Sequence, residues 1–449
     1  MKLIKRILLA LVLVIGGIII LNYPKLNIIS GFAAKNMASN RFIAARTVEA
    51  VTKEDHNVPM IKLANVEVNE DHVAATVYGL MERRSVCTEG LGCVLINDDF
   101  DINEIDYKPN RTKIENGLPF PYGNNGTIDT IFKNVDYKQL HKAIEGAFDN
   151  AEVQKTRTVL VAYKNHILAE KYGDGFTKNT PILGWSMTKS VLATLYGILR
   201  HQDKIDMDYR PFRELDLTGL VGKDPRDFIH LDELLRMQSA MAWNEDYTSI
   251  SDVTKMLFMA SDMTKSQINT AYTLDSPKVW NYSSGTSNLL SGILRKQFKT
   301  YQEYLDFPYS ALIDKIGMHS MLIETDMAGN FVASSYGWAN TRDWAKFGIL
   351  HLNKGNWNGE QLFSPEWIDY ITKPTALSNG TYGAHWWLNA EGKYPDVPHD
   401  LYSANGYQGQ YVFVIPSKDM VIVRTGLAED PEFDVNKFIS EVIKAINLE

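Results

Sequence analysis

The pattern of hydrophobic and polar positions divides the chain into segments with different periods. Arg157 to Tyr163 and Ile167 to Tyr172 are rich in β-branched and aromatic residues, and the short turn between them predicts a β-hairpin. A second hairpin is predicted near the C-terminus, where Tyr411 to Ile415 and Met420 to Arg424 flank a turn that contains proline. A final amphipathic helix is predicted over residues 435–446.

Between the two hairpins the pattern is mainly helical. Apolar residues from Val191 to Leu199 fall on one face of a helix, and mixed, largely helical patterning continues to about Asn389. Strands at both ends of a region with helices between them indicate one sheet assembled from distant segments. We therefore predict an α/β (α+β) fold in which an antiparallel sheet is flanked by helices and a helical subdomain is inserted.

The N-terminal segment has the pattern of an export signal. Lys2, Lys5 and Arg6 precede an unbroken apolar run from Ile7 to Leu21, as in the charged and apolar regions of a signal. No convincing cleavage site with small residues follows the run. We therefore favour an uncleaved anchor in the inner membrane over residues 4–21, with the body in the periplasm or otherwise outside the cytoplasm. A cleaved signal peptide is the alternative.

The rest of the N-terminal third lacks strong helical periodicity. From about residue 24 to residue 150 the chain consists of short β-like pieces and turn-rich stretches. We predict three regions: residues 1–22 as a signal or membrane anchor, residues 23–135 as an extension packed on the main domain, and residues 136–449 as that domain.

The two cysteines agree with export. Cys87 and Cys93 lie close together with a Gly-containing loop between them, which favours a small disulfide in an oxidising compartment. Two free buried thiols are the alternative. No further ligand lies nearby at metal-binding spacing, so we expect no metal site here.

Composition and charge exclude one class of partner. With 45% hydrophobic and 22% charged residues, the 449-residue chain has ordinary globular composition. Its formal net charge is −8, and no long run of Lys or Arg follows the N-terminus. We therefore expect no nucleic-acid partner, because phosphate binding needs a concentrated basic face.

The candidate nucleophile is Ser186, which forms an S-x-x-K motif with Lys189 at the start of the predicted helix. The two residues lie one turn apart on the same helix face. A Lys whose pKa is lowered by burial can take the proton of a serine hydroxyl, which is a weak nucleophile without a base. The N–H of Ser186, at a helix N-terminus, can also face a developing oxyanion. Taken alone, the motif is better explained by a Ser helix cap and a solvated Lys.

Two later segments supply further candidates. Tyr282 and Ser284 form a Tyr-x-Ser sequence before an apolar, helix-like run, and a Tyr hydroxyl can relay a proton if cations lower its pKa. The turn at Gly406 and Tyr407 leads directly into a strand, and a backbone N–H there can be a second oxyanion donor. An ordinary buried Tyr and a simple hairpin turn are the alternatives.

In this order the three elements resemble the serine β-lactamase and penicillin-binding-protein superfamily. More closely, they resemble its class C-related branch, which includes the 6-aminohexanoate-dimer (nylon oligomer) hydrolases. The resemblance covers about Asp136 to the C-terminus and implies a β-lactamase-like three-layer fold with no cofactor and no metal. The stretches that carry it are Gly184 to Ser190, Leu235 to Ser239, Trp243 to Tyr247, Thr341 to Gly348 and Gly406 to Gln410.

The resemblance also implies roles for individual residues. The implied catalytic residues are Ser186 as nucleophile, Lys189 as general base and Tyr282 as proton relay. The backbone N–H groups of Ser186 and Tyr407 would form the oxyanion hole. The implied supporting or substrate-binding residues are Ser284, Glu245, Tyr247 and Gly406.

One departure from the superfamily changes the expected substrate. Ala404-Asn405-Gly406 stands where the superfamily usually has Lys or His, then Thr or Ser, then Gly. Without a cation to hold a substrate carboxylate, an amidase or esterase is favoured over a β-lactamase. We therefore expect an exported serine hydrolase that cleaves small-molecule amides or esters through an acyl-enzyme on Ser186. A peptidoglycan DD-peptidase or β-lactamase-type enzyme and a non-catalytic penicillin-binding-like sensor are the alternatives.

Overall fold

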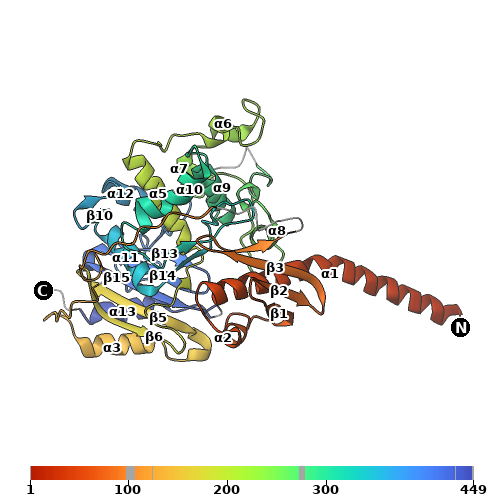
Figure 1. The fold of residues 1–449 in the computed structure, drawn as a ribbon, viewed down its shortest axis with the longest axis horizontal. Helices are drawn as coiled ribbons and strands as arrows, with labels where there is room; N and C mark the ends of the chain where they lie inside the picture. The colour runs from red at the N-terminus through yellow and green to blue at the C-terminus, as the bar shows by residue number, and fades with distance from the viewer. Residues whose placement is uncertain (1, 98–106, 124, 273–278, 430, 447–449) are drawn as a thin grey trace.

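The computed structural model describes residues 2–97, 107–123, 125–272, 279–429 and 431–446 (Figure 1). Its centre is an antiparallel sheet of six strands in the order β12-β13-β14-β15-β5-β6. The sheet joins segments from both ends of the main domain, as the sequence predicts. Its strands are β5 (Thr156–Tyr163), β6 (His166–Tyr172), β12 (Trp387–Leu388), β13 (Tyr402–Gly406), β14 (Gln410–Ile415) and β15 (Met420–Gly426).

Both predicted hairpins are present in this sheet. β5 and β6 form the first, and β14 and β15 form the second. The two hairpins join through β15 and β5, with Ile422 opposite Val161. Runs of Val and Ile favour these strands, because branched side chains pack well on a pleated surface.

Helices cover both faces of the sheet, so successive residues of its central strands point into different cores. On one face Leu160 and Val423 pack with α5 (Met187–His201) and α11 (Thr341–Leu352). On the other face Val161 and Ile422 pack with α3 (Tyr137–Gly146) and α13 (Val435–Lys444). The result is a three-layer arrangement, with the predicted final helix in one outer layer.

The helical subdomain comes between β6 and β12 in the chain. Besides α5 and α11, its helices are α6 (Pro211–Glu214), α7 (Leu231–Leu235), α8 (Asp252–Met259), α9 (Ser284–Arg295), α10 (Tyr301–Pro308) and α12 (Glu366–Thr372). Its short strands are β7 (Ile182–Leu183), β8 (Leu322–Ile323), β9 (Gly337–Ala339), β10 (Asn356–Trp357) and β11 (Glu360–Gln361). The short helix α4 (Ala151–Gln154) precedes β5.

The N-terminal region has an antiparallel sheet of its own, in the order β1-β2-β3-β4. A disulfide joins Cys87 and Cys93, which are paired neighbours in β3 and β4. The disulfide prediction is therefore confirmed. The elements of the region are α2 (Val48–Lys53), β1 (Ala64–Val68), β2 (His72–Val77), β3 (Leu80–Thr88) and β4 (Gly92–Ile96).

The first helix, α1 (Lys2–Phe42), is longer than the sequence pattern predicts. It continues through Pro24 and crosses the predicted boundary at residue 22. The expectation that helical periodicity is absent beyond residue 24 is therefore wrong for this segment. The cause is a buried stripe at helical spacing that packs on β2, β3 and α8. Its members include Ile29, Ala33, Met37 and Ala38.

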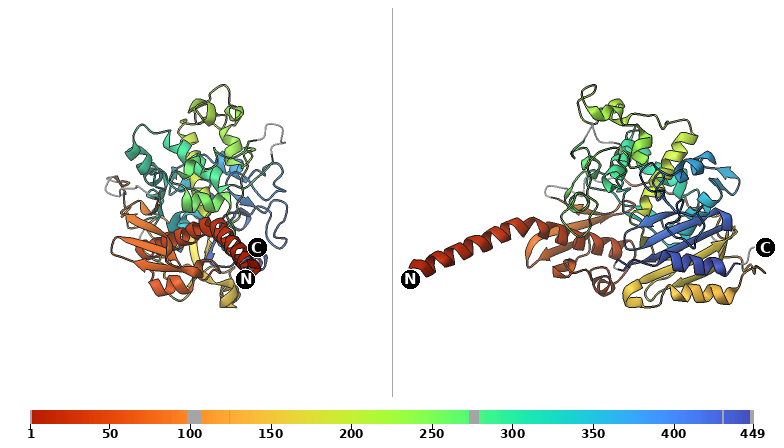
Figure 2. Two further views of the ribbon diagram at one scale, coloured as in Figure 1. Left: turned by 90° about the vertical axis from the view of Figure 1, so that its right-hand side faces the viewer. Right: turned by 180° about the vertical axis from the view of Figure 1, so that it is seen from behind.

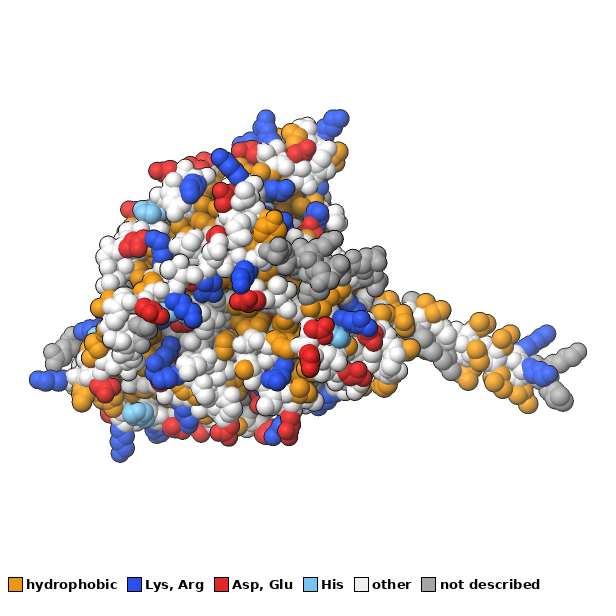
Figure 3. Space-filling model, viewed as in Figure 1, with side chains coloured by type: hydrophobic (Ala, Val, Ile, Leu, Met, Phe, Trp, Pro, Cys, Tyr) orange, Lys and Arg blue, Asp and Glu red, His pale blue; other side chains and the backbone are white. Residues whose placement is uncertain are grey.

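The first half of α1 projects away from the body (Figures 1 and 2). Its apolar side chains are exposed, for example Ile4 at 62%, Leu8 at 57% and Leu13 at 67%, and Figure 3 shows such side chains along the projecting segment. Within the residues that the structure describes, no helix has the length and apolar character needed to cross a membrane. The anchor over residues 4–21 stays a prediction.

Buried polar contacts join the second half of α1 to the main domain. Lys35 Nζ lies 2.7 Å from Glu324 Oε2, and the two side chains are 6% and 0% exposed. Glu324 Oε1 also accepts hydrogen bonds from Ser39 Oγ and Cys93 N, both at 2.8 Å. Glu324 therefore joins α1, the N-terminal sheet and the helical subdomain.

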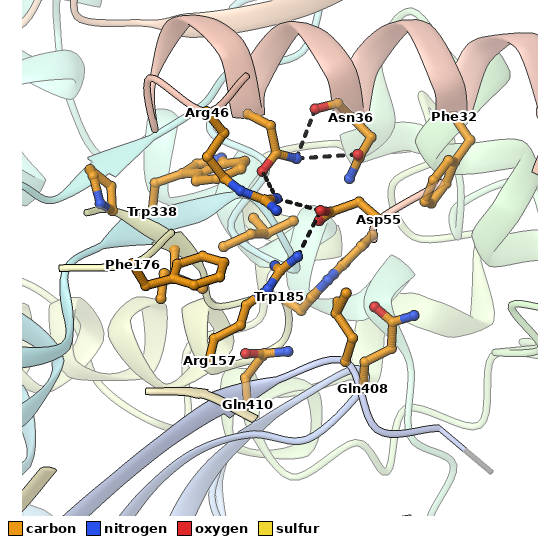
Figure 4. Close-up of a pocket in the computed structure, with 15 residues that line it drawn as sticks. Phe32, Asn36, Arg46, Asp55, Arg157, Phe176, Trp185, Trp338, Gln408 and Gln410 are labelled. Carbon is orange, nitrogen blue, oxygen red and sulfur yellow. Dashed lines mark hydrogen bonds and ion pairs between the residues drawn. The ribbon is translucent and has the colours of Figure 1, made fainter. Parts of the chain in front are cut away.

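A second buried cluster lies beside α1, where residues on either side of α2 meet Arg157 of β5 (Figure 4). Asp55 accepts hydrogen bonds from Arg46 and from Arg157 Nη2, the latter at 2.6 Å. Burial alone would raise the pKa of Asp55, but the two guanidinium groups hold it below its usual value. Together with Trp185, this cluster lines a small pocket. The N-terminal region thus contacts the residue that precedes the candidate nucleophile.

Candidate active site

Ser186 lies directly before α5, after a turn with unusual backbone geometry. Trp185 has a φ of 47°, in the left-handed region that residues other than glycine rarely adopt. The turn closes with a hydrogen bond from Met187 N to Gly184 O at 3.1 Å. Ser186 occupies the N-cap position but makes no side-chain capping bond. The helix-cap alternative is therefore excluded, and the hydroxyl is available to another partner.

That partner is Lys189, whose side chain is buried in the main domain. Its Nζ lies 2.8 Å from Ser186 Oγ, 2.9 Å from Ser284 Oγ and 2.9 Å from Ser334 O. Burial lowers the pKa of Lys189 to about 8, and the negative charge of Glu245 opposes this effect only in part. A lysine with this pKa is partly neutral near physiological pH, and the neutral amine can accept a proton.

Ser284 connects Lys189 to an acidic side chain. The Ser284 hydroxyl donates to Glu245 Oε1, and the Ser284 N–H donates to Glu245 Oε2 at 2.9 Å. The proton of the Ser284 hydroxyl is directed at Glu245, so toward Lys189 this hydroxyl acts only as a hydrogen-bond acceptor. The carbonyl of Ser334 is also only an acceptor. These two acceptors occupy both N–H bonds of a neutral Lys189 amine. The lone pair of the amine then faces Ser186.

Tyr282 lies close to the same amine. Lys189 Nζ is 5.0 Å from the centroid of the Tyr282 ring. Burial and the charge of Glu245 raise the pKa of Tyr282, and a hydrogen bond with Ser186 lowers it only in part. The condition set for a relay by Tyr282, a pKa lowered by cations, is therefore not met. A neutral phenol can still pass a proton between neighbours, but it does not act as a phenolate base.

The turn after β13 packs against the nucleophile turn. A Cβ at Gly406 would lie 2.1 Å from Gly184 O, so only glycine permits this close approach. The ring of Tyr407, the next residue, meets Trp185 edge-on with centroids 5.6 Å apart. Within the described part of the chain, neither Ser186 N nor Tyr407 N donates to a backbone acceptor. Both N–H groups are thus free to bind a substrate oxygen.

Aromatic side chains form the walls of the site. Tyr247 stacks on Tyr407 with centroids 4.6 Å apart and an interplanar angle of 14°. Trp185 meets the Tyr247 ring edge-on as well. Tyr282 packs against Trp387 with centroids 5.2 Å apart. Walls of this kind suit a substrate that is uncharged next to the bond that reacts.

The structure brings the candidate residues together in one site. Ser186, Ser284 and Tyr282 surround the Lys189 amine, and Glu245 is joined to it through Ser284. Gly406, Tyr407 and Tyr247 pack around the turn that carries Ser186. The sequence analysis missed the carbonyl of Ser334, which carries no side-chain signal. It also missed the left-handed Trp185, although the glycine before it could have indicated a tight turn.

No metal-binding cluster accompanies these residues. Among the residues with described positions, no group of three or more His, Cys, Asp or Glu side chains is arranged to hold a metal ion. The expectation that the site uses no cofactor stays a prediction.

Comparison with known proteins agrees with this geometry. The model of the family described as Beta-lactamase matches residues 141–436, which include Ser186, Lys189 and Tyr282. The 6-aminohexanoate-dimer hydrolase of Paenarthrobacter ureafaciens is 25% identical over 304 residues, covering 62% of this chain and 74% of that protein. The first 140 residues lie outside the family match.

Solved structures share the architecture. A D-stereospecific amidohydrolase from a Streptomyces species has a TM-score of 0.53 at 14% identity, covering 69% of this chain and 98% of that one. A family VIII carboxylesterase has a TM-score of 0.52 at 15% identity, covering 69% of this chain and 97% of that one. The predicted fold, an antiparallel sheet flanked by helices with an extra N-terminal region, is confirmed.

Proposed function

Because this chain belongs to the beta-lactamase family, we propose that it cleaves amide or ester bonds through a covalent acyl-enzyme on Ser186. The observation that carries the proposal is the 2.8 Å contact between Ser186 Oγ and Lys189 Nζ, in a site where burial lowers the pKa of Lys189 to about 8. A hydroxyl beside a partly neutral amine is an activated nucleophile.

In the proposed acylation step, Ser186 Oγ attacks the carbonyl carbon of the substrate and its proton passes to Lys189 Nζ. As the new C–O bond forms, an electron pair of the carbonyl group moves to the carbonyl oxygen. The N–H groups of Ser186 and Tyr407 stabilise that negative oxygen. Tyr282 passes a proton to the leaving amine or alcohol as the scissile bond breaks.

In the proposed deacylation step, water attacks the carbonyl carbon of the acyl-enzyme and gives up a proton to the same base. The bond to Ser186 Oγ breaks, and the serine oxygen recovers a proton. The second product is a carboxylic acid. Glu245 and Ser284 keep the lone pair of Lys189 directed at the reacting oxygen in both steps.

The proposed substrate is a small amide or ester that needs no cation for its recognition. Ala404 and Asn405 stand where related sites have a cation and a hydroxyl, and the neighbouring walls are the rings of Tyr247 and Tyr407. The similar proteins include one named for an amide-linked dimer and one named as a carboxylesterase, which supports this class.

Active-site labelling tests the proposal. A fluorophosphonate probe is expected to label wild-type protein stoichiometrically at Ser186, because the hydroxyl is activated. The Ser186→Ala variant should stay unlabelled. Side-by-side assays with a p-nitrophenyl ester, 6-aminohexanoate dimer, a D-Ala-D-Ala peptide and a penicillin then identify the substrate class.

One result would contradict the acyl-enzyme proposal, and a second would contradict only the proposed substrate class. Wild-type protein that is folded but neither labelled nor active would indicate a binding or sensor protein with this fold. A clear preference for the D-Ala-D-Ala peptide would indicate a peptidoglycan DD-peptidase.

We also propose that the protein is exported and that residues 4–21 hold it at the inner membrane. The exposed apolar side chains of the projecting helix and the cations Lys5 and Arg6 at its start support this. The disulfide between Cys87 and Cys93 supports an oxidising compartment.

Cell fractionation tests the location. The full chain is expected in the membrane fraction. Detergent should release it, but a salt concentration of about 1 M should not, because ions do not screen apolar contacts. Release of the protein into the soluble fraction without detergent would contradict membrane attachment.

A further inference from the structure

Arg424, in the middle of the central sheet, is a buried cation that pairs with no acidic side chain in the described part of the chain. Its side chain is 0% exposed. Burial lowers its pKa to about 9, and the nearby Arg157 acts in the same direction. Within the described residues no acidic side chain forms an ion pair with it. All of its hydrogen bonds go to neutral acceptors, which are Thr156 Oγ1, Gln154 O, Gln408 O and Gly409 O.

Such a cation is costly to bury, because the guanidinium loses its hydration, and its contact with the Phe433 ring, 4.3 Å from Cζ to the ring centroid, offsets only part of that cost. Hydrogen bonds to carbonyl groups alone do not require a charged donor, since a neutral amide can make them. These hydrogen bonds alone therefore do not explain why a charged residue stands at this position. In a region of low dielectric, a positive charge acts over a longer range than in water.

Arg424 lies directly under the turn that follows β13. Its Nη1 donates to Gly409 O at 2.7 Å and to Gln408 O at 3.5 Å. Glycine makes room for it, since a Cβ at Gly409 or at Gly426 would lie 2.5 Å from a guanidinium nitrogen. The turn is thus built around the guanidinium.

Gln410 holds the remaining carbonyl of the same turn. Its Nε2 donates to Tyr407 O at 3.0 Å, and its Oε1 accepts from Gly426 N at 3.1 Å. The carbonyls of residues 407, 408 and 409 are therefore all bound from the sheet side. This leaves the Tyr407 N–H at the side of the turn where Gly406 contacts the nucleophile turn.

We propose that Arg424 is a positioning residue for the oxyanion hole, an inference that rests on the proposed function. Its guanidinium fixes the turn that presents the Tyr407 N–H. Its unneutralised charge also favours the tetrahedral intermediate, in which an electron pair has moved from the carbonyl double bond to oxygen. Arg424 transfers no proton and does not touch the substrate; it stabilises charge through the turn.

The test compares Arg424→Gln, which removes the charge, with Arg424→Lys, which keeps the charge but lacks the planar guanidinium whose second nitrogen binds Gln154 O and Thr156 Oγ1. Kinetics with p-nitrophenyl butyrate are measured beside inhibition by phenylboronic acid, which forms a tetrahedral anion on a catalytic serine. For Arg424→Gln we expect kcat to fall about 10- to 100-fold with KM changed less than about threefold. Boronic acid affinity should fall by a similar factor, and Arg424→Lys should lie between Arg424→Gln and wild type.

Arg342→Gln is the matched control, because Arg342 also pairs within the fold, with Glu170, but does not contact the turn. It should leave kcat and boronic acid affinity unchanged. If Arg424→Gln does not fold, the kcat and the boronic acid affinity of Arg424→Lys provide the test of the proposal. Unchanged boronic acid affinity in the folded Arg424 variants, or an equal loss in Arg342→Gln, would overturn the proposal.

Labelling of wild-type protein separates this test from that of the proposed function. If wild type is labelled at Ser186 and the Arg424 variants match it in both readouts, only the role of Arg424 is wrong. If wild type itself is unlabelled and inactive, the proposed function is wrong and the role of Arg424 is overturned with it.

Discussion

Lys189→Ala is expected to lower kcat/KM for a p-nitrophenyl ester about 10³-fold or more, because Ser186 then has no base. The wild-type pH profile should identify the same group. Only the neutral amine accepts a proton, so wild-type kcat/KM should rise with pH and level off above a midpoint near 8, the value to which burial lowers the pKa of Lys189. The residual activity of Lys189→Ala should not show this rise of kcat/KM with pH.

Lys346→Ala is the control for the loss of a buried lysine. Lys346 is 8% exposed and lies 3.1 Å from Asp343 in α11, where it does not contact Ser186. Its removal should leave the pH profile unchanged. The double variant of Ser186→Ala and Lys189→Ala should be no slower than the slower of the two single variants, because the two residues act as a unit. Near-normal turnover in Lys189→Ala would exclude Lys189 as the base.

Asp55→Ala is expected to lower the free energy of unfolding by about 3–5 kcal/mol. The change leaves Arg46 and Arg157 buried without the carboxylate they share, at side-chain exposures of 5% and 9%. Glu54 contacts both guanidinium groups but is 37% exposed, so it replaces the lost charge only in part. Urea denaturation of both proteins at pH 7 measures the difference.

Glu82→Ala is the matched control for this loss. Glu82 pairs with Arg84 on β3, where the side chains are 49% and 61% exposed. Its removal should change stability by less than about 1 kcal/mol, because water screens exposed pairs. An Asp55→Ala protein as stable as the Glu82→Ala protein would show that the buried cluster adds little. The contribution of Asp55 should also decline as pH falls, since its pKa is lowered and protonation removes the charge.

Local patterns were sufficient for the parts of the fold that depend on neighbouring residues. The two hairpins and α5 follow from strand composition and helical period, because those signals lie within each segment. Spacing also places Ser186 and Lys189 on one helix turn, but a helix cap with a solvated Lys explained that spacing equally well until the later motifs were considered. Tyr282 and Tyr407 are different, because their approach depends on the packing of distant elements. Only the resemblance to a known superfamily predicted it.

The failures have identifiable physical causes. The sequence analysis ended the first helix too early, because a stripe rich in alanine gives a weak hydrophobic signal and Pro24 usually marks a boundary. A lowered pKa for Tyr282 was not found, because burial and the negative charge of Glu245 both raise it. Arg424 was not singled out at all, since nothing in a strand sequence shows that a cation will lack a counter-charge.

The continuity of α1 determines how the body can be oriented. Its 41 residues form one helix, of which the outer half projects from the body (Figure 1) and the inner half packs against it through contacts that include the Lys35–Glu324 ion pair. A helix of about 20 residues is roughly 30 Å long and acts as a semi-rigid spacer, unlike a flexible linker. The outer half is therefore a semi-rigid spacer and not a flexible tether. If the N-terminal end of α1 is held in place, the active site stays at a nearly constant distance and tilt relative to that end.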